Sequence, residues 1–324
     1  MSLAPGAIQH SRSPSFDRFS IWGTSAVLGV TDASVLAEAR AILDTVLALS
    51  DHAASRFHPG TEILALNDAA GQGPMGVSAT MIDLVAAAID AARSTGGACD
   101  PTIADRLVVL GYDRDFDAGL DDGITIPAGI APAPGIEGIV IDHKASTIAL
   151  PAGVHLDLGA TAKARTADIA AEQIATDLAV GCLVDLGGDL RIAGPPPAEG
   201  WQIGITREAR TGRRDEVDEV IAVTGGGIAS SSSDVRRWQR GATTLHHLID
   251  PATGWPVAEP LAMVTVGAPT CLAANALSTA SMVWGERCLF ELPQRSVAAR
   301  VLRDDGTIER IGGWPSPVEP GRQQ

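Results

Sequence analysis

Two stretches of the chain repeat hydrophobic residues every three or four positions, which is the period of an amphipathic helix. In DASVLAEARAILDTVLALSDHAASRF, residues 32–57, Asp32 is a plausible N-cap ahead of the repeat. In residues 78–95 the same period begins after Ser78 and stops at Gly96-Gly97. The pattern predicts two long helices, joined by the stretch RFHPGTEILALNDAAGQG, which is polar and turn-rich at both ends.

Alternating hydrophobic and polar residues predict strands in much of the remaining chain. Residues 138–159 read as a hairpin whose last strand ends at Asp157, and residues 114–135 read as a surface excursion. A last helix is expected from about Leu272 to Glu286, and Asp305-Gly306 is expected to be a two-residue hairpin turn. Further strands are expected in CLVDLGGDLRIAG, EVIAVTG, LAMVTVGAP and ARVLRDDGTIERIGG. Hairpins among a few long helices favour an α+β fold over a doubly wound parallel sheet.

The length and composition suit a large folded unit. With 324 residues, 45% of them hydrophobic, the chain can bury a full core. We expect a flexible segment over 1–19, a single domain over 20–313 and a flexible tail over 314–324. No stretch approaches the roughly 20 apolar residues of a membrane span, and the first residues lack an apolar leader region, so we expect no stable membrane insertion and a cytoplasmic location. The four scattered cysteines are expected to be buried and reduced.

The net charge limits the partners of the chain. A formal charge of -15 argues against a nucleic-acid surface, because phosphate binding needs clustered Lys and Arg. An anionic ligand must therefore be held locally, by a metal, by a helix N-terminus or by a few cations.

The stretch HLDLGATAKARTADIAAEQIA, residues 155–175, is a candidate for such a site. Asp157 could simply cap a helix, with Lys163 on the solvated face of that helix. Alternatively, Gly159 lets the backbone approach a ligand, and free N–H groups of a helix beginning near Thr161 favour a diphosphate, with Lys163 adding a cation. Similar polar, Gly-containing stretches recur along the chain: FHPGTEILALN, TGGACDPTIADRLVVLGYD, LVDLGGDLRIAG, GIASSSSDVRRW, HHLIDPATGWPV and APTCLAANALSTA.

In order and spacing, over roughly Trp22 to Gly285, this series resembles the FAD:protein FMN transferases, the ApbE-like family. Its specific elements are D-L-G-x-x-A-K and H-x-I-D-P-x-T-G. The resemblance implies an ApbE-like α+β fold, with antiparallel or mixed sheets, flanking helices and two closely associated lobes. It also implies an enzyme that uses Mg²⁺ to split FAD, links FMN by a phosphoester to a Thr or Ser of an acceptor protein, and releases AMP.

The resemblance further implies FAD contacts and metal ligands, carried over motif by motif. Trp22 stands where the family usually has a Met beside the isoalloxazine, and Phe57 stands at the second aromatic flavin contact. The other implied FAD contacts are Ala98, Cys99, Asp100, Asp157, Lys163 near the phosphates, and Ile249. The implied Mg²⁺ ligands are the carbonyl of Ala160 and the side chains of Asn275 and Thr279, oxygen ligands of the kind Mg²⁺ takes.

His247, in HHLIDPATG, is the candidate general base for the acceptor hydroxyl, with Asp250 as its orienter. The alternative is a hydrogen-bonded pocket histidine, since phosphoryl transfer can rely on positioning and charge neutralisation. His246 is expected to face the other side of a strand. In DPATGWP, Asp250, Thr253 and Gly254 have the spacing of the acceptor sequence that the resemblance implies, D-x-x-T-G-A-T, but Trp255 and Pro256 break the remainder. The stretch is therefore interpreted as the enzyme's own loop and not as a self-modification site.

Several positions depart from the family pattern. Asn275 replaces the metal-site Asp, which removes a negative ligand and is expected to weaken metal binding, and Asn275→Asp is expected to tighten it. Ala160 and Ala164 replace glycines, and Ser230-Ser231-Ser232 replaces T-S-G. Two alternatives therefore stand beside the transferase: an FAD pyrophosphatase that yields FMN and AMP, and a protein that binds FAD without turnover.

Overall fold

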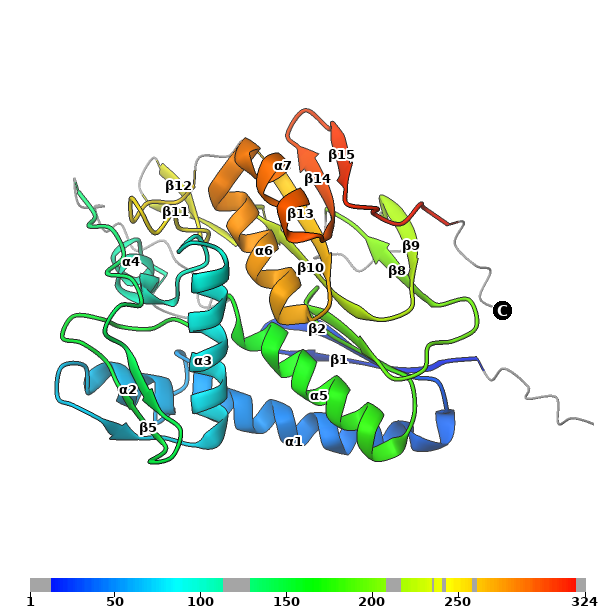
Figure 1. Ribbon diagram of the computed structural model, residues 1–324, viewed down its shortest axis with the longest axis horizontal. Helices are drawn as coiled ribbons and strands as arrows, with labels where there is room; N and C mark the ends of the chain where they lie inside the picture. Colours follow the sequence, from blue (N-terminus) through cyan, green and yellow to red (C-terminus); the bar gives the residue numbers. More distant parts are fainter. Residues whose placement is uncertain are drawn as a thin grey trace, which may run out of the picture.

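An antiparallel sheet of eight strands forms the centre of the part of the chain described by the computed structural model (Figure 1), which covers residues 13–112, 129–207, 217–234, 236–240, 243–257 and 261–318. Every neighbouring pair in this sheet is antiparallel. In spatial order the strands are β1 (Ser15–Ile21), β2 (Thr24–Val30), β6 (Cys182–Leu186), β7 (Leu190–Ala193), β10 (Gly226–Ser232), β13 (Leu261–Ala268), β14 (Ala298–Arg303) and β15 (Ile308–Ile311).

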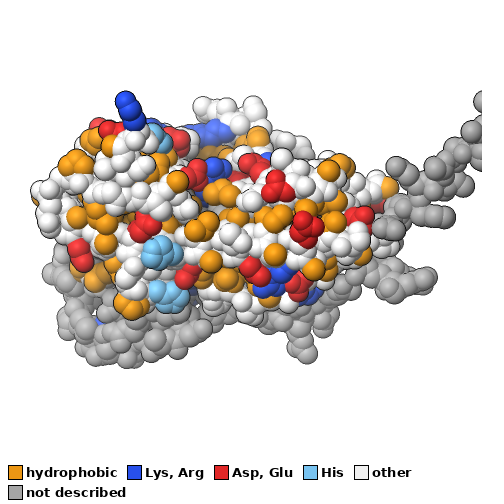
Figure 2. All heavy atoms as spheres, turned by 90° about the horizontal axis from the view of Figure 1, so that it is seen from below, with side chains coloured by type: hydrophobic (Ala, Val, Ile, Leu, Met, Phe, Trp, Pro, Cys, Tyr) orange, Lys and Arg blue, Asp and Glu red, His pale blue; other side chains and the backbone are white. Residues whose placement is uncertain are grey.

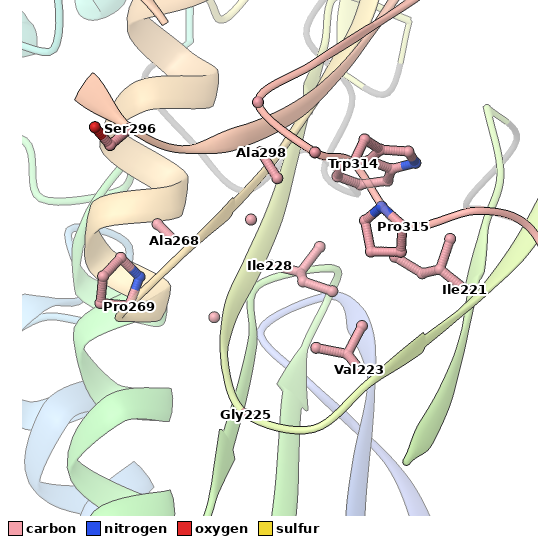
Figure 3. Close-up of a pocket in the computed structure, with 14 residues that line it drawn as sticks. Ile221, Val223, Gly225, Ile228, Ala268, Pro269, Ser296, Ala298, Trp314 and Pro315 are labelled. Atoms are coloured by element: carbon pink, nitrogen blue, oxygen red, sulfur yellow. The ribbon is translucent and has the colours of Figure 1, made fainter. Parts of the chain in front are cut away.

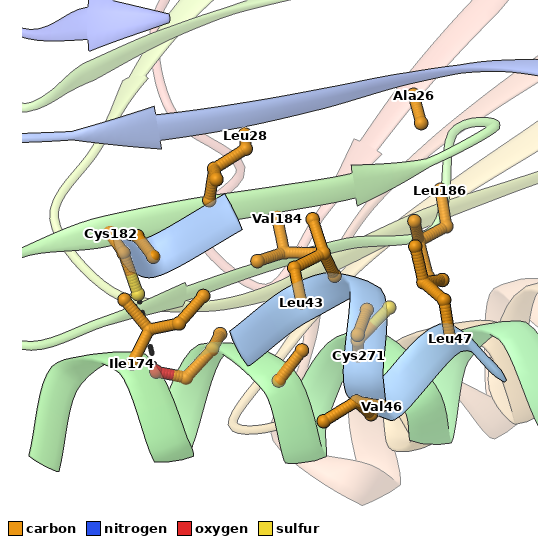
Figure 4. Packing of buried hydrophobic residues seen from close by; sticks show 14 of the residues in the cluster. Ala26, Leu28, Leu43, Val46, Leu47, Ile174, Cys182, Val184, Leu186 and Cys271 are labelled. Atoms are coloured by element: carbon orange, nitrogen blue, oxygen red, sulfur yellow. Dashed lines mark hydrogen bonds between the residues drawn. The ribbon is translucent and has the colours of Figure 1, made fainter. Parts of the chain in front are cut away.

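Three long helices cover one face of this sheet: α1 (Leu36–Ala54), α5 (Ala162–Leu178) and α6 (Cys271–Trp284). Their apolar stripes pack on the inward side chains of the strands, because the helical period places one face of each helix against the sheet. Figure 4 shows Leu43 and Leu47 of α1 facing Val184 and Leu186 of β6, all of them buried. This packing fixes the positions of the helix ends relative to the loops at one edge of the sheet.

A β-hairpin, β8 (Trp201–Ile205) and β9 (Glu219–Val223), lies over the opposite face. In β8 buried and exposed residues alternate strictly, as the two-residue period of a strand requires. The buried side of β8, which includes Trp201, packs with Leu183 and Ile192 of the central sheet. The sheet is thus buried between helices and a hairpin.

The second lobe is built around a separate apolar cluster. It contains α2 (Glu62–Asp68), α3 (Ala79–Ser94) and a small sheet in the order β3 (Met75–Gly76), β5 (Thr147–Ala149), β4 (Val140–Asp142). Helix α3 packs against α1, α5 and α6, so the two lobes are closely associated. The remaining elements are η1 (Ala33–Val35), η2 (Pro101–Ile103), α4 (Ala104–Val109), the hairpin β11 (Arg237–Arg240) and β12 (Thr243–His246), η5 (Gly285–Arg287), α7 (Cys288–Glu291) and η6 (Pro293–Arg295).

The α+β prediction and the main helices are confirmed. Asp32 accepts a hydrogen bond from the Ser34 N–H and caps the short turn that leads into α1, and Ser78 accepts from the Met81 N–H at the start of α3. The last long helix ends two residues before the predicted Glu286. All four cysteines are free and buried, as expected. Burial raises the pKa of Cys182 to about 12.

The structure differs from two sequence predictions and adds one short helix. Helix α2 occupies the middle of the stretch RFHPGTEILALNDAAGQG, where the sequence pattern predicts no helix. Residues 155–158 are extended but pair with no strand of the described chain, so Asp157 does not end a strand. The connection around Asp305-Gly306 is longer than two residues, because β14 ends at Arg303 and β15 begins at Ile308. The predicted excursion over 114–135 is described only in part: residues 114–128 lie outside the described residues, residues 129–135 are exposed or half-buried, and the Ala133 N–H donates to the Pro251 carbonyl.

The predicted end segments are also shorter than expected. Ser15 to Phe19 belong to β1 and pair with β2, so the folded part begins before residue 20. At the other end, the buried Trp314 donates from Nε1 to Glu219 Oε1 at 2.7 Å, and the Val318 N–H donates to the Val220 carbonyl at 2.7 Å. Residues 1–12 and 319–324 lie outside the described residues, and the rest of the domain division stays a prediction.

The face below α1 and α5 mixes both signs of charge, and Figure 2 shows acidic, basic and hydrophobic side chains interspersed on it. None of the helices that the structure describes combines the length and the apolar character needed to cross a bilayer.

Candidate active site

A cluster of polar side chains lies where the N-terminal end of α5, the turn between β6 and β7, and α6 meet. Lys163 of α5 approaches Asp189 of the turn, with 3.2 Å between Nζ and Oδ2. Asn275 of α6 donates from Nδ2 to Asp189 Oδ1 at 2.7 Å. Asp189 and Asn275 are buried, so these contacts are shielded from water and their geometry is well defined. One carboxylate therefore joins a cation and an amide from two different helices.

The turn that carries Asp189 is formed by glycines in the left-handed region. Gly187 and Gly188 have φ angles of 75° and 93°, which residues with a side chain rarely adopt. The Gly188 N–H donates to Asp185 Oδ1 at 2.7 Å, so the Asp185 carboxylate closes the turn from within. Burial, with the nearby Asp189 charge, raises the pKa of the Asp185 carboxyl to about 6. The turn thus places two carboxyl groups near Lys163.

The segment before α5 brings Asp157 to the same region. Its Oδ1 accepts the Gly159 N–H at 2.8 Å, and the Thr161 side chain makes no capping bond, so no side chain caps the first turn of α5. Asn67 of α2 holds the extended segment through both the N–H and the carbonyl of Leu156. Asp157 closes a tight turn ahead of a helix. A structural role of Asp157 in this turn and a role of the same turn in binding a ligand are therefore compatible.

Arg56 connects Asp157 to a group of aromatic rings. Its Nε lies 2.9 Å from Asp157 Oδ2, and its Nη1 donates to the Tyr112 carbonyl at 2.7 Å. The guanidinium lies 4.5 Å from the centre of the Phe57 ring and 4.4 Å from that of Tyr112. Sequence reasoning missed Arg56, although it precedes the predicted Phe57 directly.

The predicted flavin contacts Phe57 and Ile249 lie at this aromatic group. Phe57 meets Tyr112 edge-on with ring centres 6.0 Å apart, and Tyr112 stacks on Trp238 at 5.4 Å. Ile249 is buried in the same cluster as Tyr112 and Trp238. An apolar, ring-lined wall therefore adjoins Arg56 and Asp157.

Trp22 reaches the site from the turn between β1 and β2. It adopts a left-handed φ of 51°, and its Nε1 donates to Asp51 Oδ1 at 2.8 Å. The other oxygen of Asp51 lies 3.1 Å from His58 Nδ1. Because His58 follows Phe57 in the chain, the contacts of Asp51 connect the segment of Trp22 to that of Phe57, the two residues predicted to contact the flavin ring.

The predicted turn at Ala98, Cys99 and Asp100 is largely occupied with structural bonds. Ala98 and Cys99 are buried, and the Cys99 N–H donates to Thr95 Oγ1 at 3.0 Å. Asp100 Oδ1 accepts from both the N–H and the hydroxyl of Thr102, which caps η2. The turn adjoins the site, because the Asp157 N–H donates to the carbonyl of the following Pro101 at 2.8 Å.

The three predicted metal ligands come from neighbouring parts of the fold. Ala160 packs against a small cluster that contains Cys99 and Ala276, the residue after Asn275. Thr279 lies one turn further along α6, with its Oγ1 3.3 Å from Ser231 Oγ. The Asn275 Oδ1 atom is buried and has no hydrogen-bond partner among the described residues. An unpartnered buried amide oxygen fits a Mg²⁺ ligand.

These ligands are uncharged. Across the described residues no group of three His, Cys, Asp or Glu side chains could hold a metal ion. A negative charge near the predicted ligands comes instead from Asp189, one hydrogen bond away from Asn275.

His247 follows β12 directly, and its Nδ1 is buried with no hydrogen-bond partner in the described part of the chain. Burial and the positive charge of Arg236 hold the pKa of His247 well below its usual range, and Lys163 adds to this effect. His246 turns elsewhere, with Nε2 3.2 Å from the Val257 carbonyl. Asp250 does not orient His247: its Oδ1 accepts the Ala252 N–H at 2.9 Å and closes its own loop.

The comparisons with known proteins match this fold and these motifs. The sequence profile of the ApbE family matches residues 22–301. The chain belongs to the ApbE family. It is 29% identical over 307 residues to the FAD:protein FMN transferase of Salmonella typhimurium, covering 92% of this chain and 85% of that protein. It is 28% identical over 321 residues to the FAD:protein FMN transferase of Treponema pallidum, covering 89% and 86%.

Solved structures of the ApbE family share the fold. The ApbE protein of Thermotoga maritima superposes with a TM-score of 0.79 at 25% identity, over 92% of this chain and 97% of that one. The apo form of the flavinyl transferase ApbE of Pseudomonas stutzeri superposes with a TM-score of 0.78 at 20% identity, over 94% and 96%. The predicted ApbE-like fold is confirmed.

The serines that replace the family's T-S-G in this ApbE-family chain lie in β10. Ser231 faces α6, with its Oγ 2.9 Å from Ser278 Oγ, and Ser230 faces the opposite way, with its Oγ 2.8 Å from Thr265 Oγ1. The substitution therefore keeps a hydroxyl beside Thr279.

A separate apolar cavity of ≈ 340 Å³ lies outside this cluster (Figure 3). Trp314 and Ile221 border it on one side and Pro269 on the other, and its lining contains no charged side chain. It is lined by none of the predicted site residues.

Proposed function

We propose that this chain is an FAD:protein FMN transferase, which cleaves FAD, attaches FMN to a Thr or Ser hydroxyl of an acceptor protein and releases AMP. The observation that carries the proposal is the joining of Lys163, Asp189 and Asn275 beside the N-terminal end of α5. A lysine and free helix N–H groups suit a diphosphate, which is the bond that must break. Membership of the ApbE family supports the same reaction.

In the proposed reaction the acceptor hydroxyl attacks the FMN phosphorus of FAD. A bond forms between the acceptor oxygen and the FMN phosphorus, and the bond between that phosphorus and the bridging oxygen of the diphosphate breaks, so AMP leaves with that oxygen. The acceptor hydroxyl loses its proton. His247 suits the role of base, because its lowered pKa keeps the imidazole neutral at neutral pH. Phe57 and Ile249 provide an apolar surface for the isoalloxazine, and Lys163 neutralises phosphate charge.

Mg²⁺ belongs to the proposal. The carbonyl of Ala160, the free Oδ1 of Asn275 and the hydroxyl of Thr279 are the residues that would hold it. When bound, the metal supplies positive charge that stabilises the charge building up on the diphosphate oxygens. The cytoplasmic location stays a prediction.

Analysis of the products tests the proposal against its alternatives. FAD is incubated with the protein, Mg²⁺ and an acceptor peptide that carries D-x-x-T-G-A-T, and EDTA replaces Mg²⁺ in the control. Transfer predicts AMP and a flavinylated peptide in equal amounts. Free FMN and AMP with unmodified peptide would support a pyrophosphatase, and intact FAD would support a binding protein.

A further inference from the structure

The Asn275 amide has one end paired and one end free. Its Nδ2 donates to Asp189 Oδ1 at 2.7 Å, whereas its Oδ1 is buried and has no hydrogen-bond partner in the described chain. Asn275 is 7% exposed and Asp189 is 4% exposed. A buried acceptor without a donor is destabilising, so this arrangement is typical of a position that a ligand completes.

The chemistry of Asp189 determines which end of the amide is free. Asp189 Oδ1 accepts from Asn275 Nδ2 at 2.7 Å and Oδ2 lies 3.2 Å from Lys163 Nζ, so both carboxylate oxygens act as acceptors. The amide must therefore present its NH₂ group to Asp189 and its oxygen to the other side. Since α6 and the glycine turn are fixed by the sheet, this polarity is built into the fold.

We propose that Asp189 is a positioning residue for the Mg²⁺ site. It holds the Asn275 amide with the oxygen directed to the metal, and its negative charge, one hydrogen bond away, compensates for the carboxylate ligand that Asn275 lacks. The proposal rests on the Mg²⁺ site of the proposed function. Partners that orient a metal ligand through a hydrogen bond commonly tune the affinity of the site.

The contact between Asn275 and Asp189 changes the result that we expect for Asn275→Asp. From the sequence alone this change should simply tighten metal binding. In the structure the new carboxylate faces that of Asp189 at the distance of a hydrogen bond, so two negative charges meet in the absence of metal. When Asp189→Asn is added to Asn275→Asp, an amide again donates to a carboxylate, with the two residue types exchanged.

The test is a complete cycle of Asp189→Asn, Asn275→Asp and the double variant, in the full-length protein without FAD or acceptor. Mg²⁺ affinity is measured by calorimetry, and Tm is measured without metal. We expect Asp189→Asn to raise the Mg²⁺ Kd about tenfold. We expect Asn275→Asp to lower the Tm of the metal-free protein, and the double variant to recover the Tm and to bind Mg²⁺ at least as tightly as wild type.

The matched control is Asp177→Asn, an exposed carboxylate on α5, which should change neither quantity. The inference would be overturned if the effects of the two single changes simply added in the double variant, in both Kd and Tm. Wild-type protein that binds no Mg²⁺ would also overturn it. Because these readouts need no turnover, a coupled pair in a protein that transfers no FMN would contradict the proposed function and leave the inference standing.

Discussion

At the residue scale, Lys163 is the cation that we propose for diphosphate binding. It is one of two lysines in an acidic chain, and it already contacts Asp189 at 3.2 Å. The D-L-G-x-x-A-K pattern predicted this lysine at the start of α5. Its partner could not be predicted, because Asp189 and Asn275 are separated from it in sequence and meet only when α5, the glycine turn and α6 pack together.

Lys163→Ala should weaken FAD binding. Loss of a hydrogen bond to a charged group is worth about 1.5–3 kcal/mol, so we expect the FAD Kd to rise at least tenfold. Calorimetry or quenching of flavin fluorescence measures the Kd, and Lys144→Ala, the other lysine, on the exposed turn between β4 and β5, is the control. A Kd equal to that of wild type would remove Lys163 from the site.

His247 should determine the acid limit of the reaction. A base acts in its deprotonated form, and the lowered pKa of His247 keeps that form dominant through neutral pH. We expect the transfer rate to be constant from about pH 8 to about pH 6.5, the ordinary value for histidine, and to fall only well below it. His247→Gln should abolish this profile and most of the rate. An unchanged rate in His247→Gln would instead favour the interpretation of His247 as a hydrogen-bonded pocket histidine that does not act as a base.

At the scale of elements, the contact between α5 and α6 sets the geometry of the site. Asp168 of α5 has a side chain that is 1% exposed, and it accepts the N–H groups of Cys271 and Leu272 at 2.8 and 3.0 Å. Arg191 of β7 lies 3.4 Å from the same carboxylate. Asp168 therefore anchors the start of the helix that carries Asn275 and Thr279.

Asp168→Ala should destabilise the whole fold. The change leaves two N–H groups and a guanidinium without their buried acceptor, and breaking a buried pair costs about 3 kcal/mol. Urea unfolding measures the free energy of unfolding, and Asp177→Ala on the exposed side of α5 is the control. A loss within about 0.5 kcal/mol, as at an ordinary surface position, would contradict this role.

Periodicity predicted the long elements better than the short ones. Helices α1, α3 and α6 span several turns and repeat the helical period often enough to be recognised. Helix α2 has seven residues and is flanked by turn residues, so it was missed. Residues 155–158 show the alternation of a strand, but alternation predicts an extended backbone and not a partner strand.

At the scale of the whole molecule, the site lies between the two lobes. Arg56, Phe57 and Asp157 connect to the lobe of α2 and α3, whereas Lys163, Asp189 and Asn275 belong to the central sheet and its helices. A net charge of -15 disfavours anions in general, so the proposed diphosphate binding relies on local cations such as Lys163 and Arg56. An elongated ligand such as FAD could contact both lobes at once.

The mass of the acceptor peptide after incubation with FAD and Mg²⁺ tests the central claim most directly. The account predicts a mass gain equal to FMN minus water on a peptide carrying D-x-x-T-G-A-T, absent with EDTA and absent when the first Thr is replaced by Ala. An unmodified peptide in the presence of Mg²⁺, while FAD is consumed or remains intact, would contradict the assignment as an FMN transferase.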